Sequence, residues 1–157
     1  MGRVDKRVYG DQAEEQFFYD AIGRLDATVD PDGVTVLYGY NEKGEQYQQA
    51  VDMDRDGTID DLVSELDRVS ETVSSITTRT YEGQTYDVRR TESFVWTDEE
   101  RILVSISDGG LDGLRQWSER FGQTTYTEIV DPDDTDGAWQ QITVQPDGSR
   151  VVETYTN

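Results

Sequence analysis

Apolar and polar residues alternate along several stretches of the chain, with the period of two that is typical of β-strands. In residues 34–40, for example, Val34, Val36, Tyr38 and Tyr40 fall on one side of the chain. This pattern predicts strands at 34–40, 45–53, 77–82, 85–96, 101–107, 123–130, 139–145 and 149–156. Short turns such as 146–148 separate most neighbours, which predicts antiparallel pairing.

Three other stretches place apolar residues three to four positions apart, which is the spacing of a helix with one apolar face. They predict helices at 12–27, 59–76 and 110–121. The second has the longest apolar stripe, and Thr58 with Asp61 resembles a capping box at its start. Its stripe consists of Ile59, Leu62, Val63, Leu66, Val69, Val73 and Ile76.

The resulting element order, roughly αββ-αβββ-αβββ, predicts an α+β fold. About three helices would pack on one or two faces of antiparallel sheet. The length of 157 residues predicts a single domain over 1–157, with 1–10 as a candidate flexible N-terminal arm. The three units share a pattern of elements but no repeat at the level of residues.

The charge of the chain indicates the kind of solvent in which the protein works. Asp and Glu total 34 against 14 Lys and Arg, which gives a net charge of −20, and only Lys6 and Lys43 are lysines. The carboxylates are spread from Asp5 to Glu153, so they form a coat and not a tail. This composition is similar to that of proteins from salt-in halophilic microbes, above all haloarchaea. The resemblance implies a surface adapted to molar salt, where the Debye length shrinks to about 3 Å and hydrated salt cations cover the carboxylates.

Composition also excludes several function classes. The chain has no Cys and no His, which removes thiol chemistry, the commonest general base and the commonest transition-metal ligand. No basic patch would bind nucleic acid, and no apolar run is long enough for a membrane span. We therefore expect a soluble cytoplasmic protein, or one inside a virus particle made in a salt-in cytoplasm, with no nucleic-acid or membrane partner. A nucleic-acid mimic is a weaker interpretation, since it would carry its carboxylates on one stripe.

The sharpest local motif is the acidic segment 52–60, which resembles the first nine positions of an EF-hand calcium loop. Side-chain ligands would be Asp52, Asp54 and Asp56, Thr58 would offer its carbonyl, and Asp60 would be a ligand or a water anchor. The pattern departs at position 12, which is Val63 and not Glu, and the preceding segment is a predicted strand. The segment is therefore either a weak Ca²⁺ or Mg²⁺ site or a structural turn in which Thr58 caps the next helix.

Three further features carry weaker hypotheses. The acidic loop 131–137 could hold a hard cation through its oxygens. Gly109 and Gly110 precede the third predicted helix and could offer N–H groups to an anion. Two carboxylates at a suitable distance could catalyse hydrolysis. With 34 acidic residues, the sequence alone does not indicate which two would form such a pair.

Most tyrosines and many threonines fall in predicted strands, where they form polar faces that a partner could contact. With no nucleophile motif, P-loop or dinucleotide fingerprint, we expect a non-enzymatic structural or protein-interaction subunit from a halophilic archaeon or its virus. Its partner would be another protein or further copies of itself. The alternatives are a cation-binding regulatory module through 52–60 and a small carboxylate-dependent hydrolase.

Overall fold

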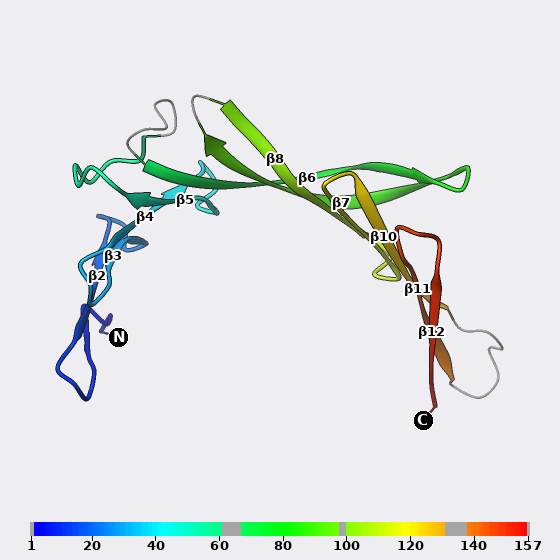
Figure 1. Ribbon diagram of the computed structural model, residues 1–157, viewed down its shortest axis with the longest axis horizontal. Coiled ribbons are helices and arrows are strands. Elements are labelled where there is room, and N and C mark those ends of the chain that lie inside the picture. Colours follow the sequence, from blue (N-terminus) through cyan, green and yellow to red (C-terminus); the bar gives the residue numbers. More distant parts are fainter. Residues whose placement is uncertain (1, 61–66, 98–99, 131–137, 157) are drawn as a thin grey trace. The chain divides into compact units, whose positions relative to one another are not determined.

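The structure is a computed structural model that describes residues 2–60, 67–97, 100–130 and 138–156. These residues form twelve β-strands and no helix, and each strand pairs with its neighbours in sequence (Figure 1). The strands are β1 (Lys6–Val8), β2 (Glu14–Tyr19), β3 (Leu25–Val29), β4 (Thr35–Tyr40), β5 (Gln46–Asp52), β6 (Asp67–Tyr81), β7 (Gln84–Thr97), β8 (Glu100–Gly110), β9 (Arg115–Arg120), β10 (Gln123–Val130), β11 (Trp139–Val144) and β12 (Arg150–Tyr155).

The predicted α+β fold is therefore wrong: this is an all-β chain that forms an antiparallel meander. The predicted strands themselves are confirmed. β4, β5, β7, β8, β10, β11 and β12 lie at the predicted positions within a few residues, and the predicted strand 77–82 is the end of the longer β6. Alternation thus located the strands correctly, and the error lies in the three helices.

The helix predicted at 12–27 is replaced by β2, a turn and β3. The Asp20 carboxylate accepts hydrogen bonds from the N–H groups of Ile22 and Arg24 and thereby fixes the turn. Gly23 closes this turn with a φ of 90°, a conformation that side chains with a Cβ rarely adopt. The local hydrogen bonds of Asp20 therefore compete successfully with a helix.

The helix predicted at 59–76 is also wrong in the part of it that the structure describes. Residues 67–76 belong to β6, whereas 61–66 lie outside the described residues. The segment from Val69 to Thr80 is rich in Val, Thr and Ile, whose β-branched side chains favour strands. Its alternation is hidden because Asp67, Glu71 and Arg79 occupy inward positions that sequence analysis would assign to solvent.

The helix predicted at 110–121 is the end of β8, a turn and then β9. Trp117 in β9 is fully buried, with Arg115 and Glu119 beside it on the same face. Because two of these three inward positions are charged, the alternation does not show as an apolar pattern. Phe121 and Gly122, at and just after the end of this predicted helix, form a tight turn between β9 and β10.

The chain divides into two compact units, unit 1 (1–72 and 94–102) and unit 2 (73–93 and 103–157). The core of unit 1 consists of Leu37, Ala50 and Val69, with Ala27, Ile59 and Trp96 packed against them. The core of unit 2 consists of Val88, Trp117 and Tyr126, with Tyr81, Tyr86 and Val144 around them. Because strand side chains alternate in direction, the registers place each core on one face of its unit's sheet.

Repeated turns join many of the strands. Asp20, Asp30 and Asn41 each begin a loop in which the side-chain oxygen accepts N–H groups two and four residues later. Each loop also closes by a backbone bond from a glycine three residues after its first residue. Unit 1 therefore contains an Asx-x-x-Gly turn at intervals of ten to eleven residues, a repeat that our sequence analysis missed.

Candidate functional site

The acidic segment 52–60 leaves the sheet at the end of β5 and leads toward β6. Asp52, the last residue of β5, lies opposite Asp67, the first residue of β6, in the strand register. Both carboxylates are buried, Asp67 with 2% of its surface exposed. Buried carboxylates require hydrogen-bond donors, and here the loop supplies them.

Four backbone N–H groups of the loop bind these two side chains. Asp52 accepts from Arg55 at 2.6 Å and from Gly57 at 3.2 Å. Asp67 accepts from Met53 at 2.9 Å and from Asp60 at 3.2 Å. The loop therefore wraps around the two carboxylates, which explains why acids occupy these buried positions.

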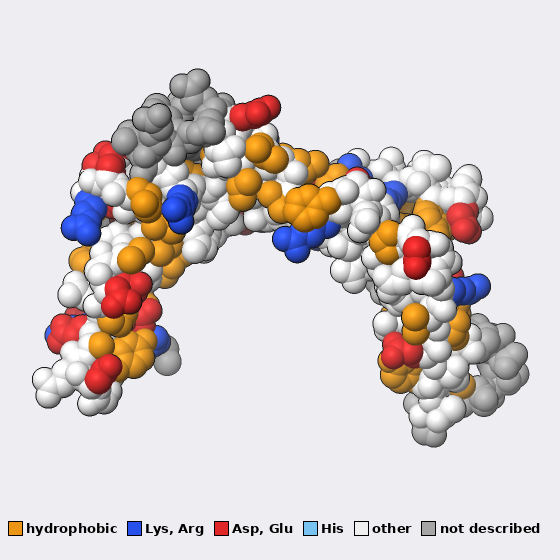
Figure 2. Space-filling view, in the orientation of Figure 1, with side chains coloured by type: hydrophobic (Ala, Val, Ile, Leu, Met, Phe, Trp, Pro, Cys, Tyr) orange, Lys and Arg blue, Asp and Glu red, His pale blue; other side chains and the backbone are white. Residues whose placement is uncertain are grey.

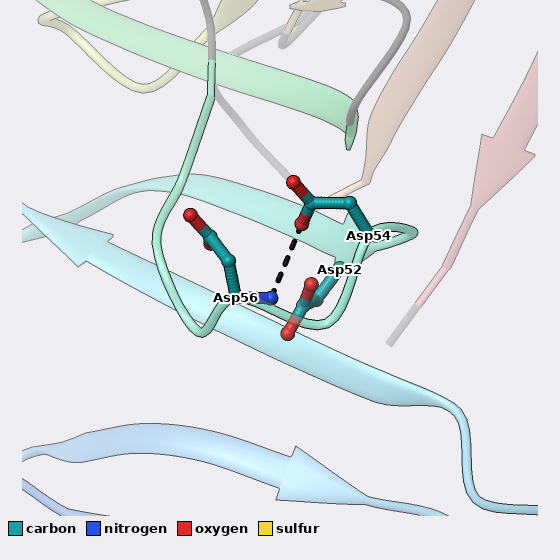
Figure 3. A group of neighbouring side chains, drawn as sticks. All are labelled: Asp52, Asp54 and Asp56. Atoms are coloured by element: carbon teal, nitrogen blue, oxygen red, sulfur yellow. Dashed lines mark hydrogen bonds between the residues drawn. The ribbon is translucent and has the colours of Figure 1, made fainter.

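Of the remaining predicted ligands, Asp54, Asp56 and Thr58 are exposed, whereas Asp60 is half-buried. Asp54 accepts the N–H of Asp56 at 3.2 Å, the bond drawn in Figure 3. Asp56 accepts both the N–H and the hydroxyl of Thr58, at 2.7 and 2.6 Å. These hydrogen bonds lower the pKa of Asp56 below its ordinary value.

The structure thus brings Asp52, Asp54 and Asp56 together, with one oxygen of each within 4.8 Å of the others. That spacing is compatible with a hard cation. However, the carboxylates already accept N–H groups of their own loop, as a structural turn requires. Residues 61–63, the last positions of a twelve-residue calcium loop, lie outside the described residues. The cation site therefore stays a prediction.

The other hypotheses drawn from the sequence can be compared with the structure in turn. Loop 131–137 lies outside the described residues. Gly109 and Gly110 end strand β8, and β9 follows where a helix was predicted, so the anion site at a helix N-terminus is wrong. In the part of the chain that is described, no helix is long and apolar enough to cross a membrane.

Sequence analysis did not identify the most deeply buried charge in the described residues, Asp108 of β8. Its carboxylate has no exposed surface and accepts three hydrogen bonds of 2.8 Å, one from Arg79 and two from Arg90. Burial acts to raise its pKa, but the hydrogen bonds from Arg90 and Arg79 outweigh burial, so the pKa is lowered. Asp108 is therefore an ionised group that links β6, β7 and β8.

The aromatic cluster of unit 2 lies beside this ion cluster. Arg79 places its guanidinium 5.6 Å from the ring centre of Trp117, and the Trp117 and Tyr126 rings stack at 5.1 Å. Burial, with a hydrogen bond to Glu128, raises the pKa of Tyr126. These contacts place the ion cluster of Asp108 directly against the aromatic core of unit 2.

The two outermost strands, β1 and β12, differ in a way that bears on function. β1 has three residues, and two of them, Lys6 and Arg7, pair with glutamates of β2. β12 has six residues, all exposed, including Val151, Val152 and Tyr155. Figure 2 shows apolar side chains on the surface among charged ones over both units. β12 is therefore the longer and more apolar of the two edges.

Comparison with protein-family models, with curated proteins and with solved structures found no match for this chain. Its function must therefore be argued from its own surface.

Proposed function

We propose that this protein is a structural subunit that assembles in high salt by pairing its β12 strand with β12 of a second copy. The observation that carries the proposal is the contrast between the two edges. Proteins protect sheet edges with short strands, charges or proline, because an open edge is a template for another strand. β1 is short and charged, whereas β12 is six residues long, contains no proline and exposes two adjacent valines.

The hydrogen-bonding groups of β12 that remain for a partner follow from its turn. The Gln145 N–H donates to the Ser149 carbonyl at 2.8 Å, so this pair is hydrogen-bonded. Bonded and non-bonded pairs alternate along an antiparallel ladder. Val151, Glu153 and Tyr155 therefore bond to β11, and the N–H and C=O groups of Arg150, Val152 and Thr154 point outward.

These outward groups define one register for a symmetric pair. A twofold axis at Val152 places this residue opposite its own copy and Arg150 opposite Thr154. No two like charges then face each other, and the two Val152 side chains pack together. Because each chain carries a net charge of −20, the pairing needs molar salt to screen repulsion.

The test measures molar mass by size exclusion with light scattering in molar potassium chloride. We expect a dimer for the wild type and a monomer for Val152→Pro, which removes an outward N–H that β11 does not use. Val152→Lys should also give a monomer, since it brings two ammonium groups together. Val8→Lys, the matched change on β1, should leave the dimer intact. A monomeric wild type, or a Val152→Pro protein that still dimerises, would refute the proposal.

A further inference from the structure

The sheet of unit 2 has a second face, opposite the Trp117 core, which we call the hydroxyl face. It consists of every second residue along seven strands: 74–80 of β6, 85–93 of β7, 105–109 of β8, 116–120 of β9, 123–129 of β10, 139–143 of β11 and 151–155 of β12. Ser, Thr and Gln occupy fifteen of these twenty-five positions. The hydroxyls meet across strands, as between Thr127 and Thr143 at 3.4 Å.

Few of the residues on the hydroxyl face are charged. Its charged residues are Asp87, Arg89, Arg120 and Glu153, so its formal net charge is zero. The chain as a whole carries −20. The opposite face of the same strands also sums to zero, so the excess of carboxylates lies outside these strand faces. Recognition by the hydroxyl face would therefore depend on its uncharged polar groups.

A recess of about 390 Å³ lies on this part of the sheet. Polar groups from Gln116, Thr127 and Gln141 line it together with Ile129 and the glycines at the end of β8. At Gly109, the space where a Cβ would stand has no atom within 4 Å, so a ligand can reach the backbone. The volume is within the range of small-molecule sites. Gln116, Thr127 and Gln141 offer uncharged donors and acceptors there, and Leu114 and Arg115 complete the lining.

An aromatic platform adjoins the recess. Trp139 and Tyr155 stack with ring centres 3.9 Å apart and planes inclined by 9°. Trp139 is two residues from Gln141 on the same face of β11, which is about 7 Å along the strand. Tyr155 retains 39% of its surface exposed. The platform therefore offers an apolar surface beside a row of hydrogen-bonding groups.

We infer that the hydroxyl face binds a neutral polysaccharide, with a sugar ring against the Trp139–Tyr155 stack and sugar hydroxyls bound by the amides and hydroxyls of the recess. A sugar ring has an apolar C–H face and a polar rim, which matches this combination. A second protein chain matches it less well, since the cores of protein interfaces are apolar and Ser is depleted there. Hydrogen bonding to an uncharged ligand also keeps its strength in molar salt, where ionic recognition is screened.

The test measures retention of the full-length protein on immobilised neutral polysaccharides (glucan, xylan, mannan and chitin) in molar potassium chloride. We expect retention on at least one of them, unchanged when the salt concentration is varied. Trp139→Ala removes the platform, and Gln141→Glu places a carboxylate in the recess with almost no change in shape. Each should weaken binding to a soluble oligosaccharide of the retained polymer by about tenfold or more.

Matched controls separate this effect from general ones. Gln49→Glu makes the same exchange at an exposed position of β5 in unit 1 and should bind as the wild type does. Val152→Pro should bind the soluble oligosaccharide normally, so failure of assembly and failure of binding can be told apart. Gln141→Glu keeps the test decisive if Trp139→Ala does not fold.

Several results would overturn the inference. They are absence of wild-type retention on every neutral polymer, retention on acidic polymers alone, and equal binding by Trp139→Ala, Gln141→Glu and wild type. A change of molar mass caused by Trp139→Ala without loss of sugar binding would assign the face to a second copy instead.

Discussion

Replacing Asp108 with Asn should destabilise unit 2 far more than any exposed carboxylate substitution. The change removes the negative charge that three hydrogen bonds of 2.8 Å surround, which is the buried counter-charge shared by Arg79 and Arg90. Arg79 then keeps only the more distant Glu119 carboxylate at 4.0 Å. Removing one partner of a buried ion pair costs about 3–5 kcal/mol. The arginine side chains retain 16% and 27% exposure, so water can solvate them partly, and we expect the lower end, about 3 kcal/mol.

Urea denaturation at constant potassium chloride measures this loss, because urea adds no ions. With an m-value of about 2 kcal/mol/M, the midpoint should fall by about 1.5 M. Asp87→Asn is the matched control, since Asp87 is an exposed carboxylate on β7 of the same unit, and its midpoint should stay within error of the wild type. Equal midpoints for Asp108→Asn and wild type would refute the assignment of Asp108 as a stabilising ion.

The pH dependence provides an independent check. The folded state holds the pKa of Asp108 below the value of about 3.9 expected in the unfolded chain. A group with a lowered folded pKa contributes stability above its unfolded pKa and loses it as the pH falls through the folded pKa. The difference in stability between wild type and Asp108→Asn should therefore be constant near neutral pH and shrink below about pH 4. A difference that grows on acidification would contradict the sign of this argument.

Two further predictions concern the carboxylate coat. Dialysis from molar potassium chloride into dilute buffer without divalent ions should lower the melting temperature measured by circular dichroism. The reason is that the repulsion among the charges, which sum to −20, is no longer screened. An unchanged melting temperature would contradict adaptation to salt. Calorimetric titration with calcium at high potassium chloride should give binding heat for the wild type and none for Asp54→Asn. The exposed carboxylate of Asp54 accepts one N–H of its own loop. Identical traces for the two proteins would exclude the predicted site.

Sequence alone located most of the strands from their alternating side chains, although in β4 the buried residue is Leu37, on the face opposite Val34 and Val36. β10 was predicted with its observed bounds, and β4 and β11 within one residue at each end. It failed where the inward face carries charge. Glu71 of β6 is on the same side of the strand as Val69, and it binds Arg101 and the Trp96 N–H. Arg79 of the same strand lies against Trp117 in unit 2. Such positions read as solvent-facing in the sequence, and the remaining apolar residues then matched helical spacing by coincidence.

The turns contain the signal that would have prevented this error. Asp20, Asp30 and Asn41 are each followed by glycine three residues later, and the same residues make the side-chain bonds that fix each hairpin. An Asx-x-x-Gly spacing of ten to eleven residues leaves room for strands of five or six residues and not for a helix of sixteen. The first predicted helix crosses one of these turns, so a search for turn repeats would have excluded it.

The candidate sites were predictable to different extents. The acidic turn at 52–60 could be recognised because its residues are neighbours in sequence, and the structure does bring Asp52, Asp54 and Asp56 together. Asp108 could not be recognised, since its partners lie 18 and 29 residues away and meet it only through strand register. The hydroxyl face could not be recognised from the sequence either, because it is assembled from alternate residues of seven strands.

The two proposals use different surfaces of unit 2 and are physically compatible. Strand addition at β12 extends a sheet sideways and covers neither of its faces. Residues that stand opposite each other in an antiparallel ladder point to the same side, so pairing at Val152 would place the hydroxyl faces of both copies on one side of the joined sheet. A polymer is a repeating ligand and could then contact both faces at once, which raises avidity without any new contact. Assembly through β12 would therefore strengthen binding to a polymer, whereas it would not affect a ligand that contacts only one copy.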